Sequence, residues 1–123
     1  MILGIGTDIV EIARIKRSIT NPSFLKKCYT NEEIQYCTKK GPASFAGLFA
    51  AKEAVSKALG TGFSGFSPAH IKITHNKAGR PLVDLSPNVK TPPNSQIILT
   101  IAHEKTFATA TAILVLNPEL RII

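Results

Sequence analysis

Residues 52–57 (KEAVSK) hold a carboxylate and an ammonium at a spacing that could do chemistry. On a helix, Glu53 and Lys57 lie one turn apart and project from the same face. Taken alone, such a pair is usually an exposed ion pair that stabilises the helix by about 0.2–0.5 kcal/mol. This stretch by itself therefore favours an ordinary surface ion pair.

Asp8 shifts the balance toward a functional interpretation. It follows a short apolar segment in which Gly4 and Gly6 share its face, and glycines leave room for something other than side chains. Asp8 could also cap a following helix, and both roles can hold together. If the segment packs beside the helix that carries Glu53, the two carboxylates suit Mg²⁺, which takes its remaining ligands from water and substrate phosphates. With Lys57 to neutralise phosphate charge, these residues form the minimal set for phosphoryl transfer.

The other glycines and the histidines add little independent chemistry. Residues 60–62 (GTG) follow a predicted helix, so they indicate a helix end and a turn rather than a phosphate-binding loop. His70 and His75 are five apart on a predicted strand and would face opposite sides. His103, in the predicted last hairpin turn, could meet a phosphate. The three histidines therefore predict no metal site.

Hydrophobic periodicity predicts the elements that must position these residues. The segment before Asp8 alternates as a strand, and Asp8 with Glu11 resembles a capping box, so a helix is expected to start there. After Pro68 the period changes to two, which is typical of strands, and residues 76–79 predict a hairpin turn. The predicted elements are a strand over 2–7, a helix that ends at Asn21-Pro22 with a buried stripe of Ile12, Ile15 and Ile19, helices over 31–39 and 43–59, Gly60 as the cap of the last helix, and strands over 70–75, 80–85, 96–101 and 107–116. This order predicts an α+β fold in which an N-terminal strand and helices are followed by antiparallel strands.

The composition is that of one folded domain spanning residues 1–123. Hydrophobic residues make up 44% and charged residues 19%, which excludes a disordered chain. The two cysteines, Cys28 and Cys37, form no CxxC pair, which excludes a disulfide scaffold or a cysteine-rich zinc site and fits a reducing compartment. No targeting segment or membrane-spanning run is visible, so we expect a soluble cytoplasmic protein without a membrane partner.

The net charge of +7 predicts an anionic partner. Residues 14–40 hold seven basic and two acidic residues, and thus five of the seven net positive charges. A solvated helix face is the usual explanation for such a run. Here no acid balances residues 14–27, so a docking surface for something acidic is credible.

Two motifs together resemble a known family. Residues 4–15 (GIGTDIVEIARI) and 49–62 (FAAKEAVSKALGTG) are similar to holo-[acyl-carrier-protein] synthases, the small bacterial type of 4′-phosphopantetheinyl transferase. The likeness covers nearly the whole chain, including Gly79-Arg80-Pro81 in the predicted hairpin and Ala102-His103-Glu104 near the end. The motifs are specific as a pair, in this order and at this separation, and the resemblance implies the 4′-phosphopantetheinyl transferase fold.

The resemblance also implies a reaction and roles for individual residues. Members transfer phosphopantetheine from coenzyme A to a serine of apo acyl carrier protein and release adenosine 3′,5′-bisphosphate. By this resemblance Asp8 and Glu53 bind Mg²⁺, Lys57 contacts the phosphates and assists the leaving group, and Glu53, directly or through a metal-bound water, is a candidate for deprotonating the carrier serine. The remaining residues that the resemblance places near coenzyme A are Ser56, Gly60, Arg80, Pro81 and His103, and those on the helix that meets the acidic carrier protein are Arg14 and Arg17.

The resemblance further implies a homotrimer with active sites shared between neighbouring subunits. The chain departs from the usual pattern at Ala102, where many members have serine before the histidine. That difference bears on a local hydroxyl contact and leaves the reaction unaffected.

Two other classes of function compete with this interpretation. A metal-dependent nuclease or phosphodiesterase would also use Asp, Glu, Lys and a metal, but a common nuclease signature needs Glu-x-Lys on a strand. A non-catalytic nucleic-acid-binding module would use the basic patch. The chain has no recognisable nucleic-acid motif, no Trp and only 7% aromatic residues, so stacking platforms are scarce and we expect no nucleic-acid partner.

Overall fold

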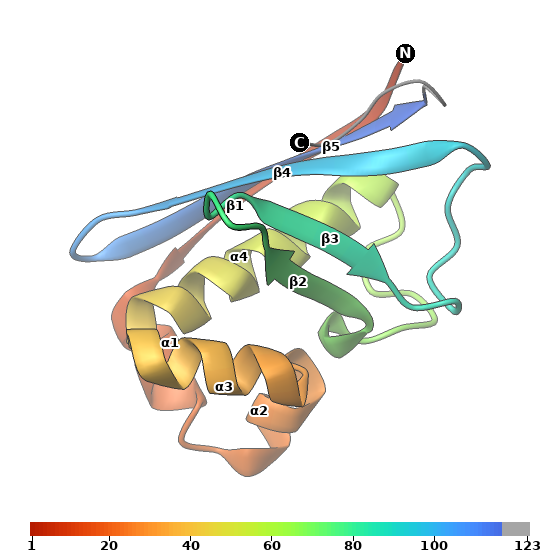
Figure 1. Cartoon of the computed structure of the whole chain (residues 1–123). Coiled ribbons are helices and arrows are strands. Elements are labelled where there is room, and N and C mark those ends of the chain that lie inside the picture. Colours follow the sequence, from red (N-terminus) through yellow and green to blue (C-terminus); the bar gives the residue numbers. More distant parts are fainter. Residues whose placement is uncertain (117–123) are drawn as a thin grey trace.

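The computed structural model describes residues 1–116, which fold into a sheet that lies on one side of a set of helices (Figure 1). The three-stranded antiparallel sheet has the order β1-β5-β4, and β2 and β3 form a separate two-stranded sheet. In chain order the elements are β1 (Ile2–Glu11), α1 (Ile12–Ser18), α2 (Pro22–Cys28), α3 (Asn31–Lys40), α4 (Pro42–Leu59), the short 3₁₀ turn η1 (Pro68–His70), β2 (Ile71–His75), β3 (Pro81–Leu85), β4 (Ser95–His103) and β5 (Phe107–Leu116). The predicted α+β class and the order of the elements are confirmed.

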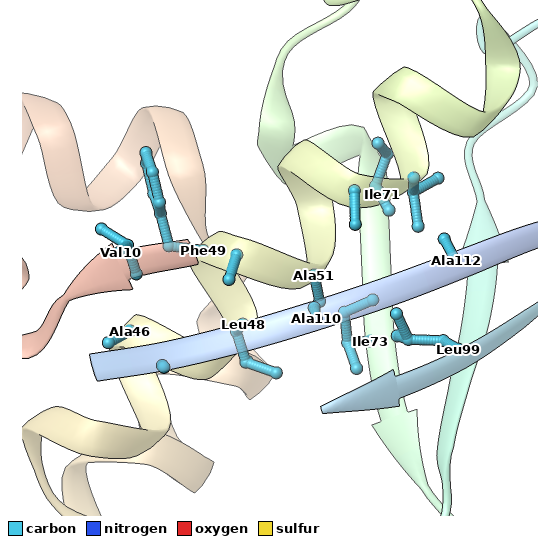
Figure 2. Close-up of a cluster of buried hydrophobic side chains, with 14 of the residues drawn as sticks. Val10, Ala46, Leu48, Phe49, Ala51, Ile71, Ile73, Leu99, Ala110 and Ala112 are labelled. Carbon is cyan, nitrogen blue, oxygen red and sulfur yellow. The ribbon is translucent and has the colours of Figure 1, made fainter. Parts of the chain in front are cut away.

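Helix α4 is the centre of the fold. It lies across the inner face of the three-stranded sheet and is buried along most of its length (Figure 1). Its apolar side chains meet those of β5, β4 and β2 in one core, part of which Figure 2 shows. As predicted, Gly60 ends the helix in the left-handed conformation, with φ of 79°.

Strand β1 and helix α4 approach each other closely because β1 carries glycines on its inner face. A side chain at Gly4 would collide with the carbonyl oxygen of Ala58, and one at Gly6 with that of Ala54. The space that the glycines leave on this face of β1 is therefore filled by the backbone of α4. This contact brings the two sequence motifs together.

The expected helix start at Asp8 is wrong. Strand β1 continues to Glu11 and pairs with β5 along its length, with Asp8 opposite Ala110. The first helix begins at Ile12, and Glu11 makes no capping hydrogen bond with its side chain. A long partner strand offers β1 a continuous ladder of backbone hydrogen bonds, and that ladder outweighs the local capping signal.

Helix α2 was not predicted, although its start signal is present. Asn21 Oδ1 accepts hydrogen bonds from the backbone N–H groups of Ser23 and Phe24, at 2.9 and 3.4 Å. Pro22 occupies the first turn, where its missing N–H costs nothing. The Asn21-Pro22 pair therefore starts a helix, while the helix before it already ends at Ser18.

The predicted strands are confirmed with shifted ends. His70 lies in η1 rather than in β2, so the argument that His70 and His75 face opposite sides of one strand is wrong. Strand β4 extends to His103, which pairs with Ala108, so His103 is a strand residue rather than a turn residue. Cys28 and Cys37 are buried free thiols, and no helix among residues 1–116 has the length and apolar character to cross a membrane.

Candidate active site

Asp8 and Lys57 form an ion pair across the junction of β1 and α4, which brings together two of the three residues that the sequence analysis assigned to one site. Lys57 Nζ lies 3.2 Å from Asp8 Oδ1 and donates a second hydrogen bond of 3.0 Å to the carbonyl oxygen of Thr7. The Lys57 side chain is half exposed, at 53%, whereas that of Asp8 is 18% exposed. The ammonium therefore stands at the mouth of the site and the carboxylate stands deeper.

Glu53 lies one helical turn before Lys57 and shares this site. Burial raises the pKa of the Glu53 carboxyl above its ordinary value, and the negative charge of Asp8 raises it further. Lys57 and Arg14 oppose the shift through their positive charges. Lys57, one turn along α4 from Glu53, is ion-paired with Asp8, so the two carboxylates belong to the same β1–α4 junction although they are 45 positions apart in the sequence.

The arrangement fits a small divalent cation of the Mg²⁺ type. The charge of the Asp8 carboxylate acts on the Glu53 carboxyl, and the Lys57 ammonium is ion-paired with Asp8. Among residues 1–116 no group of three or more His, Cys, Asp or Glu side chains could hold a metal by itself. Mg²⁺ is commonly held by one or two carboxylates and completes its shell with water and substrate phosphates, so this small donor set suits it.

Ser56 and Gly60 lie on the same helix but differ in what they present. Ser56 is 2% exposed, and its hydroxyl donates a 2.7 Å hydrogen bond to the carbonyl oxygen of Glu53. Gly60 is exposed, and a side chain there would meet open space. Of the two residues, only Gly60 therefore presents a surface that a ligand could reach directly.

His103 and Pro81 line a separate cleft of about 260 Å³ between α3, the N-terminal half of α4 and the tips of the strands. The same cleft contains Tyr36, Lys40 and His75, none of which the sequence analysis assigned to the site. The rings of Tyr36 and His75 stack with centroids 4.5 Å apart, and Lys40 Nζ lies 5.3 Å from the centre of the Tyr36 ring. The cleft thus combines flat aromatic surface with positive charge, which suits a base and a phosphate.

Sequence reasoning could have found part of this cleft. Tyr36 lies on the helix predicted over 31–39, and Lys40 follows directly after it, so one more helical residue puts the two on one face. That His75 stacks on Tyr36 depends on how the β2–β3 hairpin packs against α3, which no local pattern encodes. Arg80 is exposed beside Pro81, in an adjoining depression on the hairpin side of β4.

The predicted site residues therefore fall into two clusters in one chain. Asp8 is on β1 and His103 is on β4, and β5 lies between these strands. Neighbouring strands are about 4.8 Å apart, so two spacings put roughly 10 Å between the two backbones. The two strands also pack against different parts of α4, since Gly6 contacts its residues 54–58 and Ile101 contacts Gly47.

The basic residues of the segment 14–40 are all exposed. Arg14 lies beside the first cluster, with its guanidinium carbon 5.6 Å from the centre of the Phe49 ring. The exposed cations are Arg14, Lys16, Arg17, Lys26, Lys27, Lys39 and Lys40. Of the two acids in the segment, Glu33 is buried, so the surface is more positive than the sequence count suggests.

The helical setting of Glu53 and Lys57 separates this site from the nuclease alternative. Both residues lie on α4, as predicted, whereas the nuclease signature needs its Glu-x-Lys on a strand. The site therefore has the residue types that suit a metal and a phosphate, but it lacks the strand-borne Glu-x-Lys of the nucleases.

Comparison with known proteins agrees with this site. A family model described as the 4′-phosphopantetheinyl transferase superfamily matches residues 4–112. A holo-[acyl-carrier-protein] synthase from Clostridium botulinum (strain Eklund 17B / Type B) is 46% identical over 120 residues, which cover 93% of this chain and 98% of the relative.

Two solved structures share the fold. A holo-(acyl-carrier-protein) synthase from Bacillus anthracis str. Ames, in complex with CoA (3′,5′-ADP), is 35% identical with a TM-score of 0.79 and covers 93% of this chain and 96% of its own. A holo-[acyl-carrier-protein] synthase from Helicobacter pylori, in complex with coenzyme A, is 35% identical with a TM-score of 0.77 and covers 90% and 99% of the two chains.

Proposed function

Because the chain belongs to the 4′-phosphopantetheinyl transferase superfamily, we propose that it is a holo-[acyl-carrier-protein] synthase that moves phosphopantetheine from coenzyme A to a serine of apo acyl carrier protein. The observation that carries the proposal is the meeting of Asp8, Glu53 and Lys57 at the β1–α4 junction. The second product is adenosine 3′,5′-bisphosphate.

The transfer is a displacement at phosphorus. The oxygen of the carrier serine attacks the phosphorus that bears the pantetheine arm and forms a new P–O bond. The bond from that phosphorus to the bridging pyrophosphate oxygen breaks, and the electron pair leaves with adenosine 3′,5′-bisphosphate. The proton of the serine hydroxyl passes to a base, and the raised pKa of Glu53 makes its carboxylate a stronger base than an ordinary glutamate.

Asp8 and Glu53 are the residues that would hold Mg²⁺. The cation would supply neutralisation of the negative charge on the pyrophosphate oxygens. Lys57 adds a positive charge on the exposed side of the site, where it can stabilise the charge that develops on the leaving phosphate. The ion pair between Lys57 and Asp8 keeps this ammonium next to the carboxylates.

Coenzyme A has a second region of contact in the cleft that contains His103 and Pro81. The stacked rings of Tyr36 and His75 offer a flat surface to the adenine base, and Lys40 offers a charge to a phosphate. Burial lowers the pKa of His75, and the positive charge of Lys40 lowers it further, so His75 presents a neutral ring. Arg80 and Gly60 complete the set of residues proposed to contact the coenzyme, and the buried Ser56, whose hydroxyl bonds to the Glu53 carbonyl oxygen, would support α4 behind them.

The two clusters meet when copies of the chain associate, which we propose occurs as a homotrimer. The outer face of the three-stranded sheet supports this, since large apolar side chains lie exposed on it or at its edge: Ile2, Leu3, Ile5, Ile9 and Phe107. Ile5 and Ile9 are each 66% exposed. An apolar face of this kind is typical of a protein–protein interface.

The acidic carrier protein is proposed to dock on the exposed cations of residues 14–40. Arg14 and Arg17 lie on α1, and Arg14 is close enough to Glu53 to lower its pKa. A carrier bound to this surface would present its serine at the first cluster. Charge attraction of this kind speeds encounter and weakens as salt increases.

Mass spectrometry of apo acyl carrier protein incubated with the protein, coenzyme A and Mg²⁺ tests the proposal. We expect one phosphopantetheine group on one serine, and a loss of rate of at least about 100-fold in Asp8→Asn and Glu53→Gln, which keep the side-chain shapes. Asp84→Asn, an exposed carboxylate on β3, is the matched control and should keep the parent rate. A carrier that other enzymes of this class modify, but that this protein leaves unmodified, would contradict the proposed activity.

A further inference from the structure

Lys52 and Glu33 form a fully buried ion pair that the proposed transfer does not use. Lys52 Nζ lies 2.7 Å from Glu33 Oε1, and both side chains are 1% exposed. Lys52 immediately precedes Glu53, yet its side chain points into the core and away from the site. A buried pair of this kind is weak evidence for stability, because the cost of desolvating two charges offsets their attraction.

Every polar atom of the pair is bonded, and the bonds join four elements. Lys52 Nζ also donates to the carbonyl oxygens of Pro68, at 3.0 Å, and Ile71, at 2.8 Å. Glu33 Oε1 accepts from the backbone N–H of Thr30, and Oε2 accepts from that of Ile73 at 2.7 Å. The pair thus ties α4 to the start of α3, to η1 and to β2.

The hydrogen bonds of Lys52 hold α4 on one side, and the glycine contacts of β1 hold it on the opposite side. Each residue turns a helix by about 100°, so Ala54, whose carbonyl oxygen faces Gly6, lies roughly 200° past Lys52 and thus nearly opposite it. On the same scale Glu53, at about 100°, and Lys57, at about 140°, lie on the arc between those two contacts. With Lys52 anchored on one side and β1 packed on the other, α4 cannot turn about its own axis.

A metal site needs its ligand atoms at precise positions, so the rotation of α4 about its axis matters for Glu53. Side-chain atoms lie about 6 Å from a helix axis, so a turn of about 20° moves them by roughly 2 Å. Metal–ligand distances must hold to about 0.2 Å. Because Asp8 is on β1 and Glu53 is on α4, a small turn of α4 would separate the two carboxylates.

We propose that Lys52 and Glu33 are positioning residues that fix the rotation of α4, and with it the placement of Glu53 against Asp8 for binding Mg²⁺. This inference rests on the proposed function, since it assumes the metal at Asp8 and Glu53. The pair acts through helix packing, so neither residue touches the metal, coenzyme A or the carrier.

The double variant Lys52→Met/Glu33→Gln tests the inference, because it removes both charges together and keeps side chains of similar size. The matched control is Lys72→Met/Glu32→Gln, which removes a solvent-accessible ion pair of 3.9 Å between α3 and β2, two of the four elements that the bonds of the buried pair join. Electron paramagnetic resonance with Mn²⁺ alone as the probe gives both the dissociation constant and the number of sites. If the double variant fails to fold, Lys52→Met alone takes its place with the same measurements, because the remaining Glu33 carboxylate keeps the backbone N–H groups of Thr30 and Ile73 as donors.

We expect the double variant to bind Mn²⁺ at least about tenfold more weakly with the full number of sites, while the surface control binds like the parent. A merely structural pair gives a different result: fewer competent sites at an unchanged dissociation constant, and that result overturns the inference. Unchanged affinity with the full number of sites also overturns it. A parent protein that binds no Mn²⁺ would instead overturn the proposed metal site, and this inference with it.

Discussion

Two lysines of one short motif show how environment assigns a role to each residue. Lys52 and Lys57 are five residues apart on α4, yet Lys52 is completely buried and Lys57 is half exposed. Lys52 is bonded on all sides to protein atoms, whereas Lys57 holds Asp8 at the protein surface. Only the second lysine is placed to meet a phosphate.

At the same scale, Glu53 carries a cost to stability that its function would explain. A carboxyl whose pKa is raised in the folded state is penalised when charged, at pH values above that raised pKa. The penalty disappears as the pH falls below the ordinary pKa of glutamate, where the group is protonated in both states. We therefore expect Glu53→Gln to raise the Tm at pH 7 by about 1–4 °C, with the gain vanishing near pH 4.

Thermal unfolding in the presence of a chelator, followed from pH 4 to pH 8, measures this effect. Glu104→Gln is the control of opposite sign, because two backbone N–H groups, those of Thr106 and Phe107, bond to Glu104 and lower its pKa. That variant should lose stability at pH 7. A Glu53→Gln protein that is less stable than the parent at pH 7 would rule out the interpretation.

At the scale of elements, the junction of β1 and α4 decides whether a site exists. Glycines on β1 and alanines on α4 let the two backbones touch, and the contact sets Asp8 beside Lys57. Small residues at this junction therefore serve the site as well as the packing. The glycine face was predicted to leave room for something other than side chains, and the backbone of α4 occupies that room.

Gly6→Val should separate the two elements. The new side chain would overlap the Ala54 carbonyl oxygen and the backbone nitrogen of Ala58, and overpacking of this kind costs about 1–3 kcal/mol or more. Urea unfolding should show that loss of stability, and the transfer rate should fall further than the folded fraction. Thr100→Ala, on the exposed face of β4, should stay within about 0.5 kcal/mol of the parent. Parent-like stability and rate in Gly6→Val would contradict the role given to this junction.

At the scale of the whole molecule, one chain keeps its two candidate clusters apart. The first lies at the β1–α4 junction, and the second lies in the cleft beside His103 at the other edge of the sheet. The small domain therefore offers two partial surfaces for one long coenzyme. The exposed apolar face of the sheet offers a way for a second copy to complete each site.

Mixing two inactive variants tests a site shared between copies. Glu53→Gln removes the first cluster and His103→Ala weakens the second, so each homogeneous protein should be impaired. In a randomly mixed cyclic assembly, about one quarter of the interfaces combine an intact Glu53 with an intact His103. Co-refolded mixtures should therefore recover up to about one quarter of the parent activity. Activity in the mixture no greater than the average of the two separate proteins would exclude a shared site.

The sequence by itself determined the class of fold, most of the elements and the identity of the first cluster. Periodicity predicted α3, α4 and the later strands because these patterns repeat locally, and the two motifs that carry Asp8 and Glu53 resembled a family that places both in one site. Local patterns failed where a partner strand outweighed a cap, as at Asp8, and where one Asn-Pro pair both followed one helix and began another.

Only the tertiary structure decided which side chains of each motif are buried, paired or exposed. It joined Lys52 to Glu33, stacked His75 on Tyr36 and put β5 between Asp8 and His103. These relations depend on the close packing of elements that are distant in the chain, and no local spacing records them. The sequence thus supplied the chemical groups, and packing decided which of them one chain brings together.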